Sequence, residues 1–258
     1  MKNTAIIVGL CALAFTYVTL TQAKTGVIEK SFAVKQGGTL IVDTDSGSIS
    51  IESHNRDVVD IRVETKGENS EKFEVTFSQN GDDVRVKGDR PKLNFWNGSN
   101  AHFIVKVPQR YSVDLETSGG SIALSSLIGT VDAYTSGGSI KLGHIDGDVK
   151  VKTSGGSIRV DQVKGSINAH TSGGSIKVEM AQQPTKDSRL TTSGGSVTAY
   201  LLPSIEVDLT ASTSGGRVRS EFDVNGSVKK TNIEGKINGG GPSLVLKTSG
   251  GSVNIKKR

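Results

Sequence analysis

The sequence repeats one short motif, Thr-Ser-Gly-Gly, along its second half. Seven copies begin at Thr117, Thr135, Thr153, Thr171, Thr192, Thr213 and Thr248, at intervals of 18, 18, 18, 21, 21 and 35 residues. A degenerate copy at 231–235 divides the longest interval into 18 and 17 residues, and the two 21-residue intervals place their extra length near Pro184 and Pro203. A period this short predicts stacked units, because no single unit can bury its apolar side chains alone.

Apolar residues alternate with polar or small residues on both sides of each motif. Ile122 and Leu124 follow the first copy with one residue between them, and Val131 and Ala133 precede the second copy in the same way. Alternation with period two is typical of a half-buried strand, and no helical stripe follows residue 23. The sequence therefore predicts an all-β fold, a parallel β-solenoid (β-helix or β-roll) of 18-residue turns. Each strand is expected to pair in register with its equivalent one turn later.

The glycine pair of each motif is expected to form a sharp corner between two strands. Positive φ would cost a residue with a Cβ about 1–2 kcal/mol, and glycine avoids that cost. Parity places the Thr of the motif inside, which predicts an internal Thr column. Aromatic residues make up only 5% of the chain, so each turn must have a thin core. The corner glycines are Gly119, Gly120, Gly137, Gly138, Gly155, Gly156, Gly173, Gly174, Gly194, Gly195, Gly215, Gly216, Gly250 and Gly251.

The first residues have the pattern of a secretory signal peptide. Lys2 precedes an uncharged, mostly apolar run from Ala5 to Leu20, and small residues lead to a cleavage point after Ala23. The alternative, a membrane anchor, needs a longer apolar span of about 20 residues. We expect residues 1–23 to be removed on export to the periplasm or the cell exterior, leaving no membrane-spanning segment. Cys11, the only cysteine of the chain, lies in this segment.

Residues 24–110 alternate as strands between Gly, Asn and Asp turns but lack the 18-residue register. Residues 42–49 look like an early, imperfect copy of the repeat. We expect 24–110 to form a β-rich cap or the start of the solenoid, and 111–258 to form the repeat solenoid. A cap would close a sheet edge that otherwise invites strand-to-strand aggregation.

A basic column stands out on the predicted outer surface. Lys141, Arg159 and Lys177 take the same outward position in three successive units, and Arg219 takes it in a later one. Like charges side by side destabilise a sheet. One explanation is a face on which the nearby carboxylates Asp161, Glu179 and Glu221 neutralise the cations. The other is a basic stripe that docks an anionic glycan or a membrane surface.

The single Trp of the chain, Trp96, lies in a polar stretch rich in turn residues. An aromatic side chain on a loop can stack on a sugar ring, and this is one interpretation of its position. The other is that the indole packs over the cap as local core. Both interpretations remain open at this point.

The sequence offers no motif for catalysis, metal binding or cofactor binding. Its four His residues share no metal-binding spacing, and no G-x-S-x-G motif occurs. Calcium-binding β-rolls carry a recurring Asp in G-G-x-G-x-D, whereas the turn here reads S-G-G-S-I. The net charge of +5 is too small to indicate nucleic acid as a partner. The main enzymatic alternative is a carbohydrate-active β-helix enzyme of the polysaccharide lyase or hydrolase kind.

An exported chain with the strand Gly38–Asp43, an entry at Val107-Pro108 and repeated strand-TSGG-strand units resembles a known family. It is similar to the bacterial putative-adhesin β-strand-repeat family, a domain of unknown function. The resemblance implies a β-helix-like fold and an adhesive or surface role, and it supplies no catalytic residues. We therefore expect a non-enzymatic exported protein that contacts an anionic glycan, cell-surface or envelope component.

Overall fold

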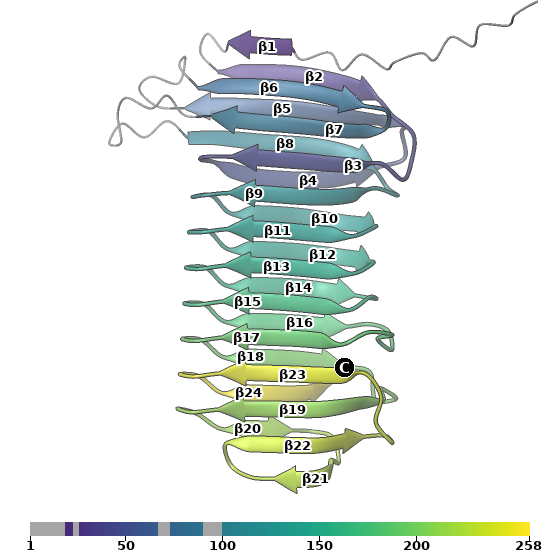
Figure 1. The fold of residues 1–258 in the computed structure, drawn as a ribbon, viewed down its shortest axis with the longest axis vertical. Helices are drawn as coiled ribbons and strands as arrows, with labels where there is room; N and C mark the ends of the chain where they lie inside the picture. The colour runs from purple at the N-terminus through teal and green to yellow at the C-terminus, as the bar shows by residue number, and fades with distance from the viewer. Residues whose placement is uncertain (1–18, 23–25, 67–72, 90–99) are drawn as a thin grey trace, which may run out of the picture.

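The computed structural model describes residues 19–22, 26–66, 73–89 and 100–258, and these residues form strands and no helix. The strands form two sheets that face each other along one elongated column (Figure 1). Sheet A has 13 strands in the spatial order β1 (Thr19–Gln22), β6 (Glu74–Asn80), β7 (Asp83–Asp89), β3 (Thr39–Thr44), β9 (Ser112–Thr117), β11 (Val131–Thr135), β13 (Val149–Thr153), β15 (Ile167–Thr171), β17 (Ser188–Thr192), β23 (Ser243–Thr248), β19 (Val207–Thr213), β22 (Asn232–Ile237) and β21 (Asn225–Val228).

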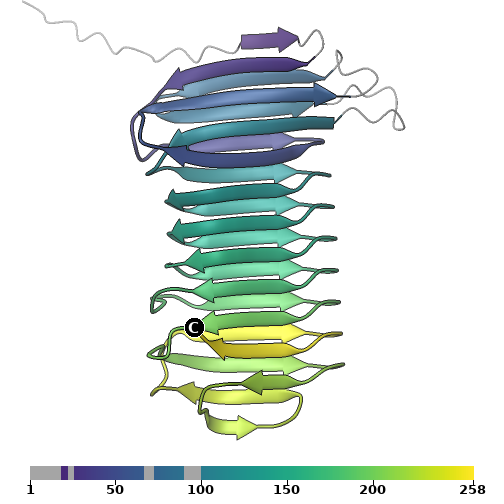
Figure 2. The ribbon, with the colours of Figure 1, turned by 180° about the vertical axis from the view of Figure 1, so that it is seen from behind.

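Sheet B forms the opposite face of the column (Figure 2). Its 11 strands follow the order β2 (Val27–Ala33), β5 (Val58–Lys66), β8 (Asn100–Pro108), β4 (Ser48–His54), β10 (Ile122–Ile128), β12 (Ile140–Asp146), β14 (Ile158–Val163), β16 (Ile176–Met180), β18 (Val197–Leu201), β24 (Val253–Lys257) and β20 (Val218–Ser220). One strand of sheet A, its Gly-Gly corner and the next strand of sheet B together form what we call a rung.

The rungs from β9 to β18 stack in chain order. Neighbouring strands are parallel and in register, so that Val131 lies beside Val149 and Ile140 beside Ile158, one repeat apart in both sheets. The inward residues are Val, Ile, Leu and Ala, and they are almost fully buried. The predicted parallel, in-register pairing is confirmed here, because every unit carries its apolar residues at the same positions.

The Thr of each motif lies inside the column, as its parity predicts. The hydroxyls of Thr135, Thr153 and Thr171 each donate a 2.7 Å hydrogen bond to the carbonyl oxygen of the second corner glycine in the preceding rung. Each hydroxyl also accepts the N–H of the second glycine of its own corner, at 3.3–3.4 Å. The buried Thr side chains therefore supply hydrogen-bond partners to half-buried backbone groups of these corners.

The corner glycines are needed for space and not for positive φ, so our conformational explanation was wrong. None of the fourteen has positive φ. A Cβ on the second glycine of a corner would lie 2.1 Å from a backbone oxygen of the preceding rung at Gly138 and at Gly156. The first glycine has more room, and at Gly119 nothing lies within 4 Å of such a Cβ. Glycine lets the backbones of successive corners approach closely.

At the N-terminal end, β3 and β4 form one more rung, and β7 and β8 pair with it in parallel. β3 pairs in parallel with β9 and β4 with β10, so the imperfect repeat at 42–49 takes the position of a rung. Next to this rung, β6 and β7 form an antiparallel pair, and β2, β5 and β8 form an antiparallel group. Phe73, Phe77 and Phe103 are buried here and give this end a bulkier core.

The predicted signal peptide is described only at residues 19–22, which form β1 and pair antiparallel with β6. The predicted cleavage point and Trp96 lie outside the described residues. Within the part of the chain that the structure describes, no helix is long and apolar enough to cross a membrane. The predicted signal peptide and the role of Trp96 therefore remain predictions.

The last rung in the sequence is not the last rung in the column. β23 lies between β17 and β19, and β24 lies between β18 and β20, so Thr248 stands between Thr192 and Thr213 in the Thr column. The predicted chain order of the units is wrong at this end. The degenerate copy at 231–235 is not a rung either, because β22 runs antiparallel to β19 and forms a hairpin with β21.

Candidate functional site

The predicted basic column lies on the outer face of sheet B. Lys141, Arg159 and Lys177 are register partners on β12, β14 and β16, and all three are exposed. Equivalent positions on neighbouring strands are about 4.8 Å apart. The structure therefore brings these three cations together in adjacent rungs, as the repeat predicts.

Carboxylates neutralise this column only in part. Arg159 Nε forms a 2.6 Å ion pair with Asp161 Oδ1, as the neutralised-face explanation predicts. Lys177 instead places its Nζ 4.9 Å from the centre of the Tyr200 ring, a cation–π contact. Among the described residues, no carboxylate lies within ion-pair distance of Lys141 or Lys177.

The inserted C-terminal rung adds charge to the same face. β24 places Lys256 beside Tyr200, with Nζ 5.9 Å from the ring centre. Arg258 follows β24 and forms a 2.6 Å ion pair with Glu179, so this carboxylate is not available to Lys177. The Tyr200 ring thus lies between two lysines from different rungs.

Arg219 lies farther away than the sequence suggests. Thr198 and Asn254 occupy the two rungs between Lys177 and Arg219, because β24 is inserted next to β20. Glu221, beside it, accepts the backbone N–H of Lys257 at 2.8 Å. We call Lys141, Arg159, Lys177, Lys256 and Arg219, together with Tyr200, the cationic face.

A hollow of about 370 Å³ begins at the Lys141 end of the cationic face. Its floor contains the short side chains of Ala123 and Ser125 and the backbone of Gly143. A Cβ on Gly143 would lie 1.6 Å from the carbonyl oxygen of Ser125, so this position is closed to larger residues. The small residues create a depression beside a row of long charged side chains.

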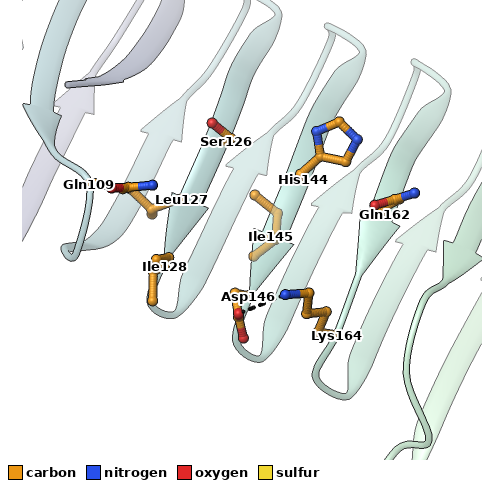
Figure 3. Close-up of a pocket in the computed structure, with 9 residues that line it drawn as sticks. All are labelled: Gln109, Ser126, Leu127, Ile128, His144, Ile145, Asp146, Gln162 and Lys164. Atoms are coloured by element: carbon orange, nitrogen blue, oxygen red, sulfur yellow. Dashed lines mark hydrogen bonds and ion pairs between the residues drawn. The ribbon is translucent and has the colours of Figure 1, made fainter. Parts of the chain in front are cut away.

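A second hollow, of about 220 Å³, shares His144 with the first, and Figure 3 shows the residues that line it. Ser126, His144 and Gln162 are register partners on three strands and line it with hydroxyl, imidazole and amide groups. Lys164 Nζ lies 3.1 Å from Asp146 Oδ2 at its rim, and Leu127 and Ile145 supply apolar surface. This mixture of polar and apolar groups is suited to sugar hydroxyls and ring faces.

The acids with the clearest pKa shifts lie outside these hollows. Hydrogen bonds from Lys186 and Ser166 lower the pKa of Asp148 to about 2. A hydrogen bond from the Ser31 hydroxyl and the charge of Arg56 lower the pKa of Asp60. Both shifts follow from contacts between neighbouring strands and loops. Among the described residues, no group of three His, Cys, Asp or Glu side chains is arranged to hold a metal ion.

The sequence pattern of the family described as Toastrack DUF4097 matches residues 38–163 and 146–256. The chain belongs to the Toastrack family. Among solved structures, it is similar to a "putative cell adhesion protein" from Clostridium sporogenes, with 18% identity, coverage of 90% of this chain and 100% of that chain, and a TM-score of 0.41. It is also similar to a "putative adhesin" from Bacteroides fragilis, with 15% identity, coverage of 92% and 99%, and a TM-score of 0.44. Comparison with curated proteins gives no match.

In this Toastrack chain, sequence reasoning identified three of the five cations as neighbours but missed Tyr200, Lys256 and His144. Tyr200 and Lys256 lie two residues after the column position in their own strands. The alternation of inward and outward residues therefore places both side chains outward. Their proximity depends on the insertion of the C-terminal rung, which chain order does not reveal. A detectable pattern did exist at the first hollow, where Ala123, Ser125 and Gly143 are small outward residues in two successive units.

Proposed function

We propose that this Toastrack chain is an exported, non-enzymatic β-solenoid of 18-residue turns that binds an anionic glycan of a cell surface or envelope through its cationic face. The observation that carries the proposal is the set of outward cations that lack a carboxylate partner among the described residues: Lys141, Lys177, Lys256 and Arg219. Stacked like charges are unfavourable in a sheet. An anionic ligand would offset this repulsion.

The chemistry of the face fits an extended, charged saccharide. Lys141, Arg159 and Lys177 follow one another across strands, so a ligand that contacts all three must lie along the column axis. Carboxylate or sulfate groups would pair with the cations. The hydroxyl, imidazole and amide groups of Ser126, His144 and Gln162 would hydrogen-bond to uncharged sugar hydroxyls at one end of the path.

Charge reversal on the two faces of the column tests this proposal. The test variant is Lys141→Glu, Lys177→Glu, Lys256→Glu on sheet B. The matched control is Lys150→Glu, Lys152→Glu, Lys247→Glu on sheet A, which makes the same change in net charge. Binding to an immobilised sulfated polysaccharide and a carboxylated one is measured against salt concentration, with neutral dextran as a reference.

The sheet B variant should lose about tenfold or more in apparent affinity for the charged polysaccharides, because a cationic surface attracts a polyanion. Its remaining binding should depend less on salt. The sheet A variant should retain most of the parent's affinity. Equal losses in both variants, or equal binding of dextran by the parent, would show that the cationic face is not a glycan site.

The second candidate function is a carbohydrate-active enzyme, and one observation favours it. Glu52 and Asp161 both line the first hollow, where Lys141 and His144 also lie. Each carboxylate has a cationic partner, Lys106 at 3.7 Å and Arg159 at 2.6 Å. Glycoside hydrolysis uses a pair of carboxyl groups, one on each side of the scissile bond. New reducing ends in any of the tested polysaccharides would establish this alternative instead.

Export is part of the proposal and has its own test. Intact mass measurement of the protein recovered from a bacterial host should give a chain that begins at Lys24. Protease treatment of intact cells, compared with lysates, then distinguishes a surface location from a periplasmic one. Complete protection in intact cells would exclude an adhesive role at the cell surface.

A further inference from the structure

The topology leaves a gap in the column that the C-terminal rung fills. β18 ends at Leu201 and β19 begins at Val207, and between them the chain passes over one rung position. The chain then forms β19 to β22 at the end of the column. Residues 243–257 return to the empty position, as the yellow strands β23 and β24 among the green ones show (Figure 1).

Each wall of this gap consists of two strand edges, one from each sheet. β23 pairs in parallel with β17 on one side and with β19 on the other, and β24 pairs with β18 and with β20. The inward side chains Leu244, Leu246 and Val253 are 0% exposed. Without its rung, the gap would expose four strand edges and an open apolar core. Such edges bind other strands readily.

The walls recognise the inserted segment by the motif that all rungs share. Thr248 Oγ1 donates a 2.6 Å hydrogen bond to the carbonyl oxygen of Gly195 on one side. On the other side, Thr213 Oγ1 donates a 2.6 Å hydrogen bond to the carbonyl oxygen of Gly251. These contacts depend on the sequence of the inserted rung and not on the chain to which it is attached.

A glycine-rich tether connects this rung to the rest of the column. Residues 238–242, Asn-Gly-Gly-Gly-Pro, join β22 to β23, and Asn238, Gly239 and Gly240 have φ of 47°, 96° and 89°. Positive φ at successive residues marks a turn that can open into an extended chain without steric penalty at glycine. Six residue steps from Ile237 to Ser243 can span about 20 Å when extended.

We propose that the gap is a strand-acceptor site and that its second occupant is the same segment, residues 243–257, of another copy of this chain. Reciprocal exchange would then give a dimer in which each column is completed by its partner. The rung contacts are the same in the monomer and in the dimer, so protein concentration and the tether decide between them. This inference is independent of what the cationic face binds.

Single cysteines on two separate full-length chains test the exchange. Thr191 on β17 and Lys247 on β23 are register partners, and neighbouring strands are about 4.8 Å apart, within the range that a disulfide spans. One chain carries Thr191→Cys and the other Lys247→Cys, both in a Cys11→Ser background. The two chains are unfolded together, refolded at low and high protein concentration, and oxidised. Non-reducing electrophoresis then measures the covalent heterodimer.

The matched control uses Lys152→Cys and His170→Cys, which are register partners in the part of the column that follows chain order. The Thr191/Lys247 pair should give about tenfold more heterodimer than the control pair, because exchange holds the two sulfurs at high effective concentration. The yield should rise with protein concentration during refolding. Heterodimer at or below the control level at every concentration, with all four variants folded by circular dichroism, would overturn the proposal.

Discussion

The first and the second glycine of the corner motif should respond very differently to replacement by alanine, as Gly119 and Gly156 illustrate. In Gly156→Ala, the new Cβ would lie 2.1 Å from the carbonyl oxygen of Gly138, 2.5 Å from its carbonyl carbon and 2.6 Å from the Cα of Ser139. In Gly119→Ala, the new Cβ would meet nothing within 4 Å. Gly119 is the first glycine of its motif and has open space beside it, whereas a Cβ on the first glycine Gly155 would lie 3.1 Å from the carbonyl oxygen of Gly137.

The expected cost of Gly156→Ala follows from what the Cβ would strike. All three atoms belong to the backbone of the preceding rung, which is held in register and cannot rotate aside as a side chain can. Overpacking of this kind costs about 1–3 kcal/mol. Displacement of the Thr153 hydroxyl, which bonds both Gly138 and Gly156, adds about 1 kcal/mol. The total of about 3 kcal/mol corresponds to a fall in Tm of about 6–12 °C for a chain of this size.

Gly119→Ala should be neutral or stabilising by up to about 1 kcal/mol, since alanine restricts the unfolded chain and Gly119 has no positive φ. Thermal unfolding followed by far-ultraviolet circular dichroism measures both variants against the parent. If the two substitutions lowered Tm equally, backbone conformation rather than close approach would explain the corner glycines. A harmless Gly156→Ala would refute the packing argument altogether.

Two further predictions concern contacts between rungs. Thr153→Val should lower the free energy of unfolding by about 1–3 kcal/mol, because it leaves the half-buried Gly138 carbonyl without its donor, and Thr153→Ser should recover most of the loss in chemical denaturation. Asp148→Asn should remove a pH-dependent contribution. The pKa of Asp148 is lowered to about 2 in the folded chain from 3.8, so its stabilisation is present above pH 3.8 and is lost as the pH falls through 2. Because its side chain is 40% exposed, the contribution is about 1 kcal/mol or less. The difference in Tm between Asp148→Asn and the parent should therefore shrink as the pH falls from 3.8 through 2, and a difference of unchanged size across this range would contradict this assignment.

Much of the fold is predictable because the repeat makes each rung chemically equivalent to the next. Inward residues such as Ile140 and Ile158 lie at the same position of every unit, and a register shift by one residue would turn them outward. The same equivalence hides the order of the rungs. The inserted motif forms the same Thr-to-Gly hydrogen bonds with Gly195 and Thr213 that rungs in chain order form with one another. Sequence alone therefore predicts the pairing rule but not which copy occupies which place.

In the candidate site too, some features follow from the spacing of residues in the sequence and others depend on how the rungs stack. Lys141, Arg159 and Lys177 are neighbours because their rungs follow chain order, so their column could be read from the spacing. The reason for the corner glycines could not be read from the sequence, since a need for positive φ and a need for space both select glycine. The distinction depends on the distance to the next backbone, which is a property of the stack.

The insertion of the C-terminal rung also determines the charge pattern of the cationic face. In chain order, β20 would lie beside β18, and Arg219 would be the register partner of Thr198. In the column, β24 takes that place and brings Lys256 next to Tyr200, opposite Lys177. The inserted rung therefore moves one cation away from the face's centre and supplies another. A chain that ends before Ser243 would lose the rung formed by β23 and β24, which pairs with strands on both sides of the gap, and would lose the contact of Lys256 with Tyr200. The stability of the column and ligand binding should therefore both decrease.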